Sequence, residues 1–256
     1  MLSPTTEKKY TEMCNQYGHL QQQFPDTQIT NLRKQGLSTG SIRNILCAFK
    51  WQSGDNKYDT YIHELNSQQR KEKPLHTNRF KKIDWSTLTE PTNHTINDVI
   101  KGLYIYFPPR RIEDYAYMQY ITSDTNIGEN NYYNSTSNEF IFKKYKTYHR
   151  YGEQRFSVPP KLVNLLTSYI ETEQLPSGAT LLQYNGKSGK FSERTLRNKL
   201  QKIFGVSVDG LRHSYITYLY KTPENLYNIE DISNKMAHSV GIHITYLDKD
   251  NQKNEN

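Results

Sequence analysis

Apolar residues recur at helical spacing in the first quarter of the chain. Four of them fall on one face of a predicted helix: Ile42, Ile45, Leu46 and Phe49. Ser38 precedes this stripe and is a suitable N-cap. The pattern predicts a helical N-terminal domain over residues 1–72. Residues 73–83 are basic, contain a proline and lack helical periodicity, which is typical of a linker between domains.

Residues 84–248 mix helical and extended patterns. Three runs rich in aromatic and β-branched residues predict strands: 131–134, 139–145 and 154–158. Helical periodicity surrounds these runs, for example from Ser192, a predicted N-cap, to Gly205, where the helix should end. Residues 249–256 form a polar tail. The sequence therefore predicts a mostly α fold with a small antiparallel β-sheet (α+β), in which a helical domain precedes a mixed one.

Charge suggests the class of partner. The 256 residues contain 33 Lys and Arg against 26 Asp and Glu, a formal net charge of +7, which favours a polyanion such as nucleic acid. No apolar stretch approaches the roughly 18 residues of a membrane span, so we expect no membrane partner. Cys14 and Cys47 have no Cys or His neighbour at metal-ligand spacing, so we expect no disulfide framework and no metal.

The residues that carry chemistry are concentrated near the end of the chain. Leu211-Arg212-His213-Ser214 is followed by Met236-Ala237-His238-Ser239 and then by Tyr246, while Arg111 and Lys146 come earlier. A phosphodiester attacked by a hydroxyl gains negative charge on its non-bridging oxygens, and guanidinium forks stabilise that charge. We therefore assign this role to Arg111 and Arg212.

The remaining groups complete a strand-cleavage reaction. Tyr246 is the predicted nucleophile, whose phenolate nearby cations would favour. Lys146 is predicted to protonate the leaving 5′-oxygen, and His238 to donate a hydrogen bond to the phosphate. A phosphotyrosine bond retains the energy of the broken phosphodiester, so the reaction requires no cofactor, neither a metal nor a nucleotide.

These residues resemble those of the tyrosine recombinases, or phage-type integrases. Residues 211–215 are similar to the family's Leu-Arg-His-Thr/Ser box, residues 236–239 to its Leu-Gly-His-Ser box, and Tyr246 follows as its nucleophile does. Arg111 has an acid three residues later, as in the first-arginine box, and Lys146-Thr147 resembles the hairpin Lys-Thr.

The resemblance implies a fold, partners and a location. It implies a core-binding domain over 1–72 that closes with a catalytic domain over 84–248 around double-stranded DNA, in a homotetramer. The implied activity is site-specific recombination through a 3′-phosphotyrosine intermediate, with integration or excision of a viral or mobile element. The protein would then be intracellular with its DNA, in the cytoplasm or nucleoid, or in a host nucleus or viral factory.

The pattern leaves alternatives open. Asp209 stands where the family usually has His or Lys, and it is also a candidate N-cap for a helix beginning at Leu211. Arg110 competes with Arg111 for the first-arginine role. The polar tail has no apolar face to dock into another subunit, so a tetramer would need other surfaces. A type IB topoisomerase and a catalytically inactive DNA-binding relative are the alternative functions.

Basic residues outside the reacting groups are candidates for contact with the DNA backbone. Seven are predicted: Arg43, Lys50, Lys71, Lys73, Arg79, Lys81 and Lys82. The alternative for those in the helical domain is a solvated helix face.

Overall fold

The structure, a computed structural model, describes residues 2, 4–72, 81–123, 125, 127–184, 187–221 and 228–241. The chain divides into two compact units, Met1–Leu75 and His76–Asn256. Within the described residues no helix is both long enough and apolar enough to cross a membrane.

The first unit is helical, as the apolar periodicity predicted. Its α-helices are α1 (Pro4–Tyr17), α2 (Pro25–Lys34), α3 (Thr39–Ser53) and α4 (Asp59–Glu72). The side chain of Ser38 caps α3 by accepting a hydrogen bond from the Ser41 backbone N–H, and Gly54 ends the helix at φ 68°. Ile42, Leu46 and Phe49 are fully buried. α3 contacts each of the other three helices, so its apolar face holds this unit together.

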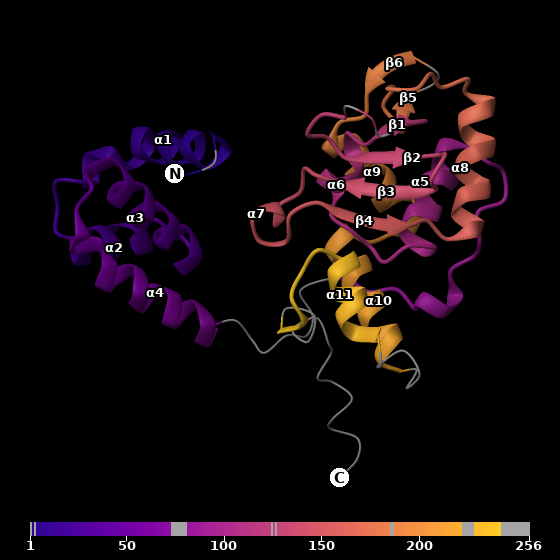
Figure 1. Ribbon diagram of the computed structural model, residues 1–256. Helices are drawn as coiled ribbons and strands as arrows, with labels where there is room; N and C mark the ends of the chain where they lie inside the picture. Colours follow the sequence, from indigo (N-terminus) through magenta and orange to yellow (C-terminus); the bar gives the residue numbers. More distant parts are fainter. Residues whose placement is uncertain are drawn as a thin grey trace, which may run out of the picture. The chain divides into compact units, whose positions relative to one another are not determined.

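The second unit is built around a small mixed sheet. Its strands are β1 (Gln119–Ile121), β2 (Tyr132–Asn134), β3 (Glu139–Phe142) and β4 (Gln154–Ser157), side by side in that order (Figure 1). The three predicted strands are confirmed and form an antiparallel ladder from β2 to β4. β1 pairs in parallel with β2, which the sequence did not predict because β1 is only three residues long. A hairpin of β5 (Gln183–Tyr184) and β6 (Lys187–Lys190) was also not predicted.

Helices surround this sheet, so the α+β class is confirmed. They are α5 (Ile96–Ile105), α6 (Ile112–Ala116), α7 (Tyr148–Tyr151), α8 (Pro160–Thr172), α9 (Glu193–Phe204), α10 (Val208–Tyr220) and α11 (Ile229–Lys235). Ser192 caps α9 and Gly205 ends it at φ 69°, as predicted. α10 and α11 pack through the apolar side chains of Ile216, Leu219, Ile232 and Met236.

An aromatic cluster fixes α6 against the sheet. The ring of Phe140, on β3, lies edge-on to those of Phe107, Tyr115 and Tyr133, with centroid distances of 5.3, 6.0 and 5.8 Å. Tyr115 belongs to α6 and is fully buried. Because these large side chains interlock, the residues that precede α6 have a defined position beside the sheet.

The start of α10 differs from the prediction. The helix begins at Val208, and Ser207 caps it by accepting a hydrogen bond from the Gly210 N–H at 3.1 Å. The predicted N-cap role of Asp209 is therefore wrong, because the serine two residues earlier supplies the cap. Asp209 lies exposed in the first turn, where the helix dipole stabilises a negative charge.

Residues 81–83, expected in the linker, pack against α10. The Ile83 N–H donates to Ser214 Oγ at 3.0 Å, and Ser214 Oγ donates to the Gly210 carbonyl at 2.8 Å. A Cβ at Gly210 would lie 2.5 Å from the Lys81 carbonyl oxygen, so this close approach requires glycine.

We expect Gly210→Ala to lower the free energy of unfolding of the second unit by about 2 kcal/mol, because a methyl group would meet backbone rather than a movable side chain. Gly128→Ala is the control, since its Cβ would have an ordinary 3.5 Å contact with Tyr132 Oη. Urea denaturation measures both variants. Equal stabilities would show that residues 81–83 move away from α10 without cost.

Candidate active site

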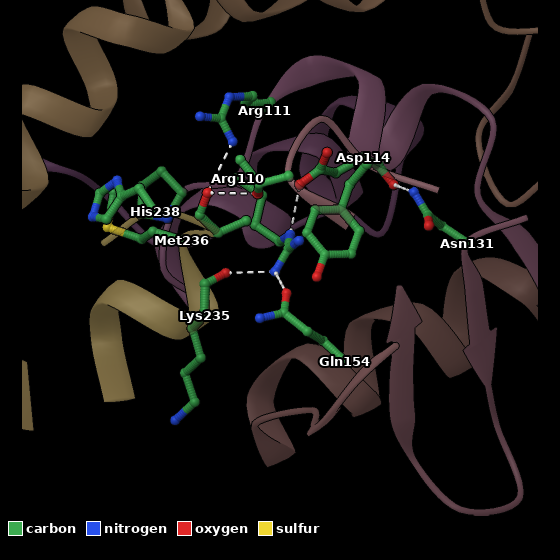
Figure 2. A network of polar contacts seen from close by, with 12 residues as sticks. Arg110, Arg111, Asp114, Asn131, Gln154, Lys235, Met236 and His238 are labelled. Atoms are coloured by element: carbon green, nitrogen blue, oxygen red, sulfur yellow. Dashed lines mark hydrogen bonds and ion pairs between the residues drawn. The ribbon is translucent and has the colours of Figure 1, made fainter. Parts of the chain in front are cut away.

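Three arginines meet at the C-terminal end of α11. The last carbonyls of a helix have no partner within it, and they carry the negative end of the helix dipole. Arg110 Nη1 donates to the Lys235 carbonyl at 2.8 Å, and Arg111 Nη1 donates to the Ala237 carbonyl at 3.1 Å (Figure 2). Arg212 donates to the carbonyl between them, that of Met236, from both Nη1 and Nη2 at 3.2 Å. Three successive carbonyls are thus each bound by a different arginine.

The chain leaves α11 through a tight reversal. Ala237 has φ 53°, its N–H donates to the Asn234 carbonyl, and the His238 N–H donates to the Ser233 carbonyl. This pair of hydrogen bonds is the Schellman arrangement, in which glycine is the usual residue at the left-handed position. Alanine in this conformation costs about 1 kcal/mol. The reversal places the His238 ring, which is only 3% exposed, next to Arg212.

Arg110 and Arg111, which compete for the first-arginine role, have different environments. Arg110 is fully buried, its Nε donates to Asp114 Oδ2 at 2.6 Å, and its guanidinium lies 3.7 Å from the centroid of the Phe142 ring. Arg110 Nη1 also donates to Gln154 Oε1 at 3.2 Å. Its charge is neutralised inside the protein. Arg111 is the N-cap residue of α6 and is partly exposed, so it is the better placed of the two to meet an external anion.

Arg212 lies in α10 and is fully buried. Its Nη1 donates to the Pro109 carbonyl at 2.6 Å, and its Nη2 lies 2.8 Å from His238 Nδ1. A guanidinium has donors and no acceptor, so Nδ1 must accept, and the hydrogen of the neutral imidazole is then on Nε2. Arg212 therefore selects the tautomer of His238 that donates from Nε2.

The loop from β3 to α7 brings Lys146 to the same place. Thr147 Oγ1 donates to the Ala237 carbonyl at 3.1 Å, so this oxygen binds both Thr147 and Arg111. Lys146 is exposed, and its positive charge acts on the Glu113 carboxyl in α6. The predicted residues Arg111, Lys146, Arg212 and His238 are thus brought together, although up to 127 positions separate them in the sequence.

Asn131 holds this loop in position, a role that the sequence analysis missed. Its Oδ1 accepts from the backbone N–H groups of Lys143 and Lys144 at 3.0 and 2.8 Å. Its Nδ2 donates to the carbonyls of Lys144 and Asp114 at 2.8 and 2.9 Å. A polar residue at the start of an aromatic strand was the available indication. Gln154, which binds Arg110, begins β4 in the same way.

Glu113 is the other residue that the sequence analysis did not single out. Burial raises the pKa of its carboxyl, and the negative charge of Asp114 raises it further. The positive charges of Arg111 and Lys146 act in the opposite direction. Glu113 is therefore part of the electrostatics of this site.

Tyrosines that lie close to the arginines are poor nucleophile candidates. Burial raises the pKa of Tyr145 to about 12 and also raises that of Tyr115. Tyr145 Oη donates to the Gly152 carbonyl at 2.7 Å, and Tyr115 is fully buried. The predicted nucleophile, Tyr246, lies outside the described residues.

The predicted DNA-contacting residues are in varied environments. Lys71 and Lys81 are exposed, and Lys82 lines a cavity of about 320 Å³ together with Trp85 and Tyr218. Lys50 is ion-paired with Asp59, which balances its charge. Arg43 is partly buried and donates to Asn44 Oδ1 at 2.9 Å. Lys73 and Arg79 lie outside the described residues.

Among the described side chains, no group of three or more His, Cys, Asp or Glu is arranged to hold a metal ion.

No family model matches the chain. No curated protein matches it either. Among solved structures, the crystal structure of XerA recombinase is similar to 98% of this chain and 89% of that chain, with a TM-score of 0.49 and 13% sequence identity. A likeness of this size identifies no activity, which depends on the residues of this chain itself.

The same substitution to lysine should have effects of different size at the two neighbouring arginines. Arg110→Lys keeps the charge but loses the hydrogen bond from Nε to Asp114 and the contact with the Phe142 ring, so we expect about 3 kcal/mol lower stability of the second unit. Arg111→Lys should cost less than about 1 kcal/mol, because Thr147 still binds the Ala237 carbonyl. Urea denaturation measures both. A larger loss for Arg111→Lys would contradict the assignment of Arg110 as the structural residue.

Proposed function

We propose that this protein cleaves and rejoins DNA through a 3′-phosphotyrosine intermediate, as a site-specific recombinase. The observation that carries the proposal is the convergence of Arg111, Arg212 and His238 on the C-terminal end of α11, with Lys146 in the loop that Thr147 ties to the same end. These are the groups that the chemistry requires, and they come from four separate parts of the chain.

Each group has a role that fits its environment. Arg111, partly exposed, binds the non-bridging phosphate oxygens. His238 donates from Nε2, and Arg212 orients it through Nδ1 while adding positive charge close to the phosphate. Lys146, exposed on its loop, protonates the leaving oxygen.

The bond changes balance without a cofactor. Tyr246 Oη releases its proton to solvent and attacks phosphorus, the bond from phosphorus to the 5′-oxygen breaks, and that oxygen takes a proton from Lys146. Attack by a 5′-hydroxyl on the phosphotyrosine reverses these steps and reseals a strand. Resealing to the original strand would relax DNA, as a type IB topoisomerase does, whereas resealing to another strand recombines it.

The partners and location follow from this activity as parts of the same proposal. Double-stranded DNA is the substrate, the first unit is a core-binding clamp, and a homotetramer on DNA performs exchange. The work proposed is integration or excision of a viral or mobile element, wherever that DNA resides in the cell.

A non-catalytic DNA-binding protein is the second candidate. Two observations favour it. Asp209 is exposed at the start of α10, where it cannot offer a phosphate a hydrogen bond from a positively charged donor, and Arg212 is fully buried. Such a protein would keep the arginine cluster as a structural feature and bind DNA without cutting it.

A denaturing gel for covalent protein–DNA adducts separates these functions. The wild-type protein, with metal chelated and with DNA from the ends of its own element, should form an adduct. Tyr246→Phe should form none while binding the same DNA with nearly unchanged affinity, because only the attacking oxygen is removed. Tyr117→Phe, at a tyrosine that is 44% exposed, is the matched control and should behave as wild type.

Two outcomes would count against the proposal. Binding without any adduct would favour the non-catalytic protein, and an adduct formed equally by Tyr246→Phe would remove Tyr246 as the nucleophile. Where an adduct forms, analysis of the DNA products distinguishes exchanged strands from relaxed supercoils.

A further inference from the structure

Glu113 lies among the groups assigned to the phosphate, and the proposed reaction makes no use of it. It follows Arg111 by two residues in the first turn of α6. Its Oε1 atom is buried and has no hydrogen-bond partner among the residues that the structure describes. A buried carboxylate oxygen normally accepts at least one hydrogen bond, since burial without one is costly. The placement of this side chain therefore calls for a role.

The charges that face Glu113 come from three elements. Arg111 and Asp114 belong to its own segment, Glu193 lies in α9, against which α6 packs, and Lys146 lies in the loop after β3. The two cations favour the ionised carboxyl and the two acids disfavour it. Glu113 thus lies close to Arg111, which is proposed to bind the DNA phosphate, and to Lys146, which is proposed to protonate the leaving oxygen.

We propose that Glu113 is a positioning residue that balances the charge of Arg111 and Lys146 in the free protein and takes up a proton when a DNA phosphate binds there. The inference rests on the proposed function, because a phosphodiester is the ligand. A phosphate at these cations brings negative charge close to the carboxylate, which disfavours the ionised form. The solvent supplies one proton, and the neutral carboxylic acid no longer repels the phosphate.

Proton uptake gives binding a defined pH dependence. The affinity for DNA is highest below the pKa that Glu113 has in the free protein. It falls as the pH rises towards the higher pKa that Glu113 has in the complex, and it is constant above that value. Because one proton is involved, the affinity changes by at most about tenfold per pH unit. The phosphodiester does not titrate in this range, so the slope reports on the protein.

The raised pKa also affects the free protein. A carboxyl whose pKa is higher in the folded state than in the unfolded state stabilises the fold below its ordinary pKa, and this stabilisation is lost as the pH rises through the folded value. Replacing the carboxyl by an amide should therefore raise the midpoint of unfolding at neutral pH and leave it nearly unchanged in acid. This measurement needs no DNA.

The decisive experiment compares the full-length wild-type protein with Glu113→Gln by calorimetric titration of a random-sequence duplex, in two buffers that differ in ionisation enthalpy. Wild type should take up a fraction of a proton that Glu113→Gln does not. The variant should also bind about tenfold more tightly at alkaline pH, since a like charge close to the phosphate is gone. Glu171→Gln, which removes the same charge from an exposed position on α8, should resemble wild type.

The outcomes separate this inference from the function on which it rests. Equal proton uptake by wild type and Glu113→Gln, or weaker binding by the variant, would overturn the role of Glu113 while duplex binding itself still stood. If none of the three proteins bound duplex, the proposed function and the inference would both fail. Proton uptake in wild type alone, together with tighter binding by Glu113→Gln, would support both.

Discussion

The binding of α11's terminal carbonyls by arginine side chains is the interaction on which the second unit depends. Lys235, Met236 and Ala237 present their oxygens in succession, and Arg110, Arg212 and Arg111 bind them. Guanidinium groups suit this task because each offers several donors in one plane and is attracted by the negative end of a helix. The same contacts join α6, α10 and α11, so that fold and candidate chemistry share one set of bonds.

The three arginines differ in burial. Arg110 and Arg212 are fully enclosed, and the aromatic cluster around Phe140 and Phe142 supplies the packing that encloses Arg110. Arg111 has a partly exposed position although it is the adjacent residue. Consecutive residues at the start of a short helix necessarily point in different directions, and here one direction leads into the core. The buried Arg110 and Arg212 thus form a rigid support for the partly exposed Arg111.

Local patterns in the sequence predicted much of the fold. Ser38, Ser192 and Gly205 were identified as helix ends because capping depends on one residue and its neighbours. β1 and the Ser207 cap were not identified, since three residues carry no periodicity and the predicted cap was Asp209, two positions later. In the site, the motif named Arg111, Arg212 and His238. The difference in burial between Arg110 and Arg111 depends on tertiary packing that no local pattern encodes. The same holds for the roles of Asn131 and Glu113.

The peptide unit between Ala237 and His238 connects these features in one rigid plane. Its carbonyl oxygen binds Arg111 and Thr147, while its N–H donates to the Ser233 carbonyl within the end of α11. A rotation of this plane would break all three contacts at once, so it would affect the first arginine and the lysine loop together. The first arginine and the lysine loop therefore share one backbone reference point, which the geometry of the end of α11 sets.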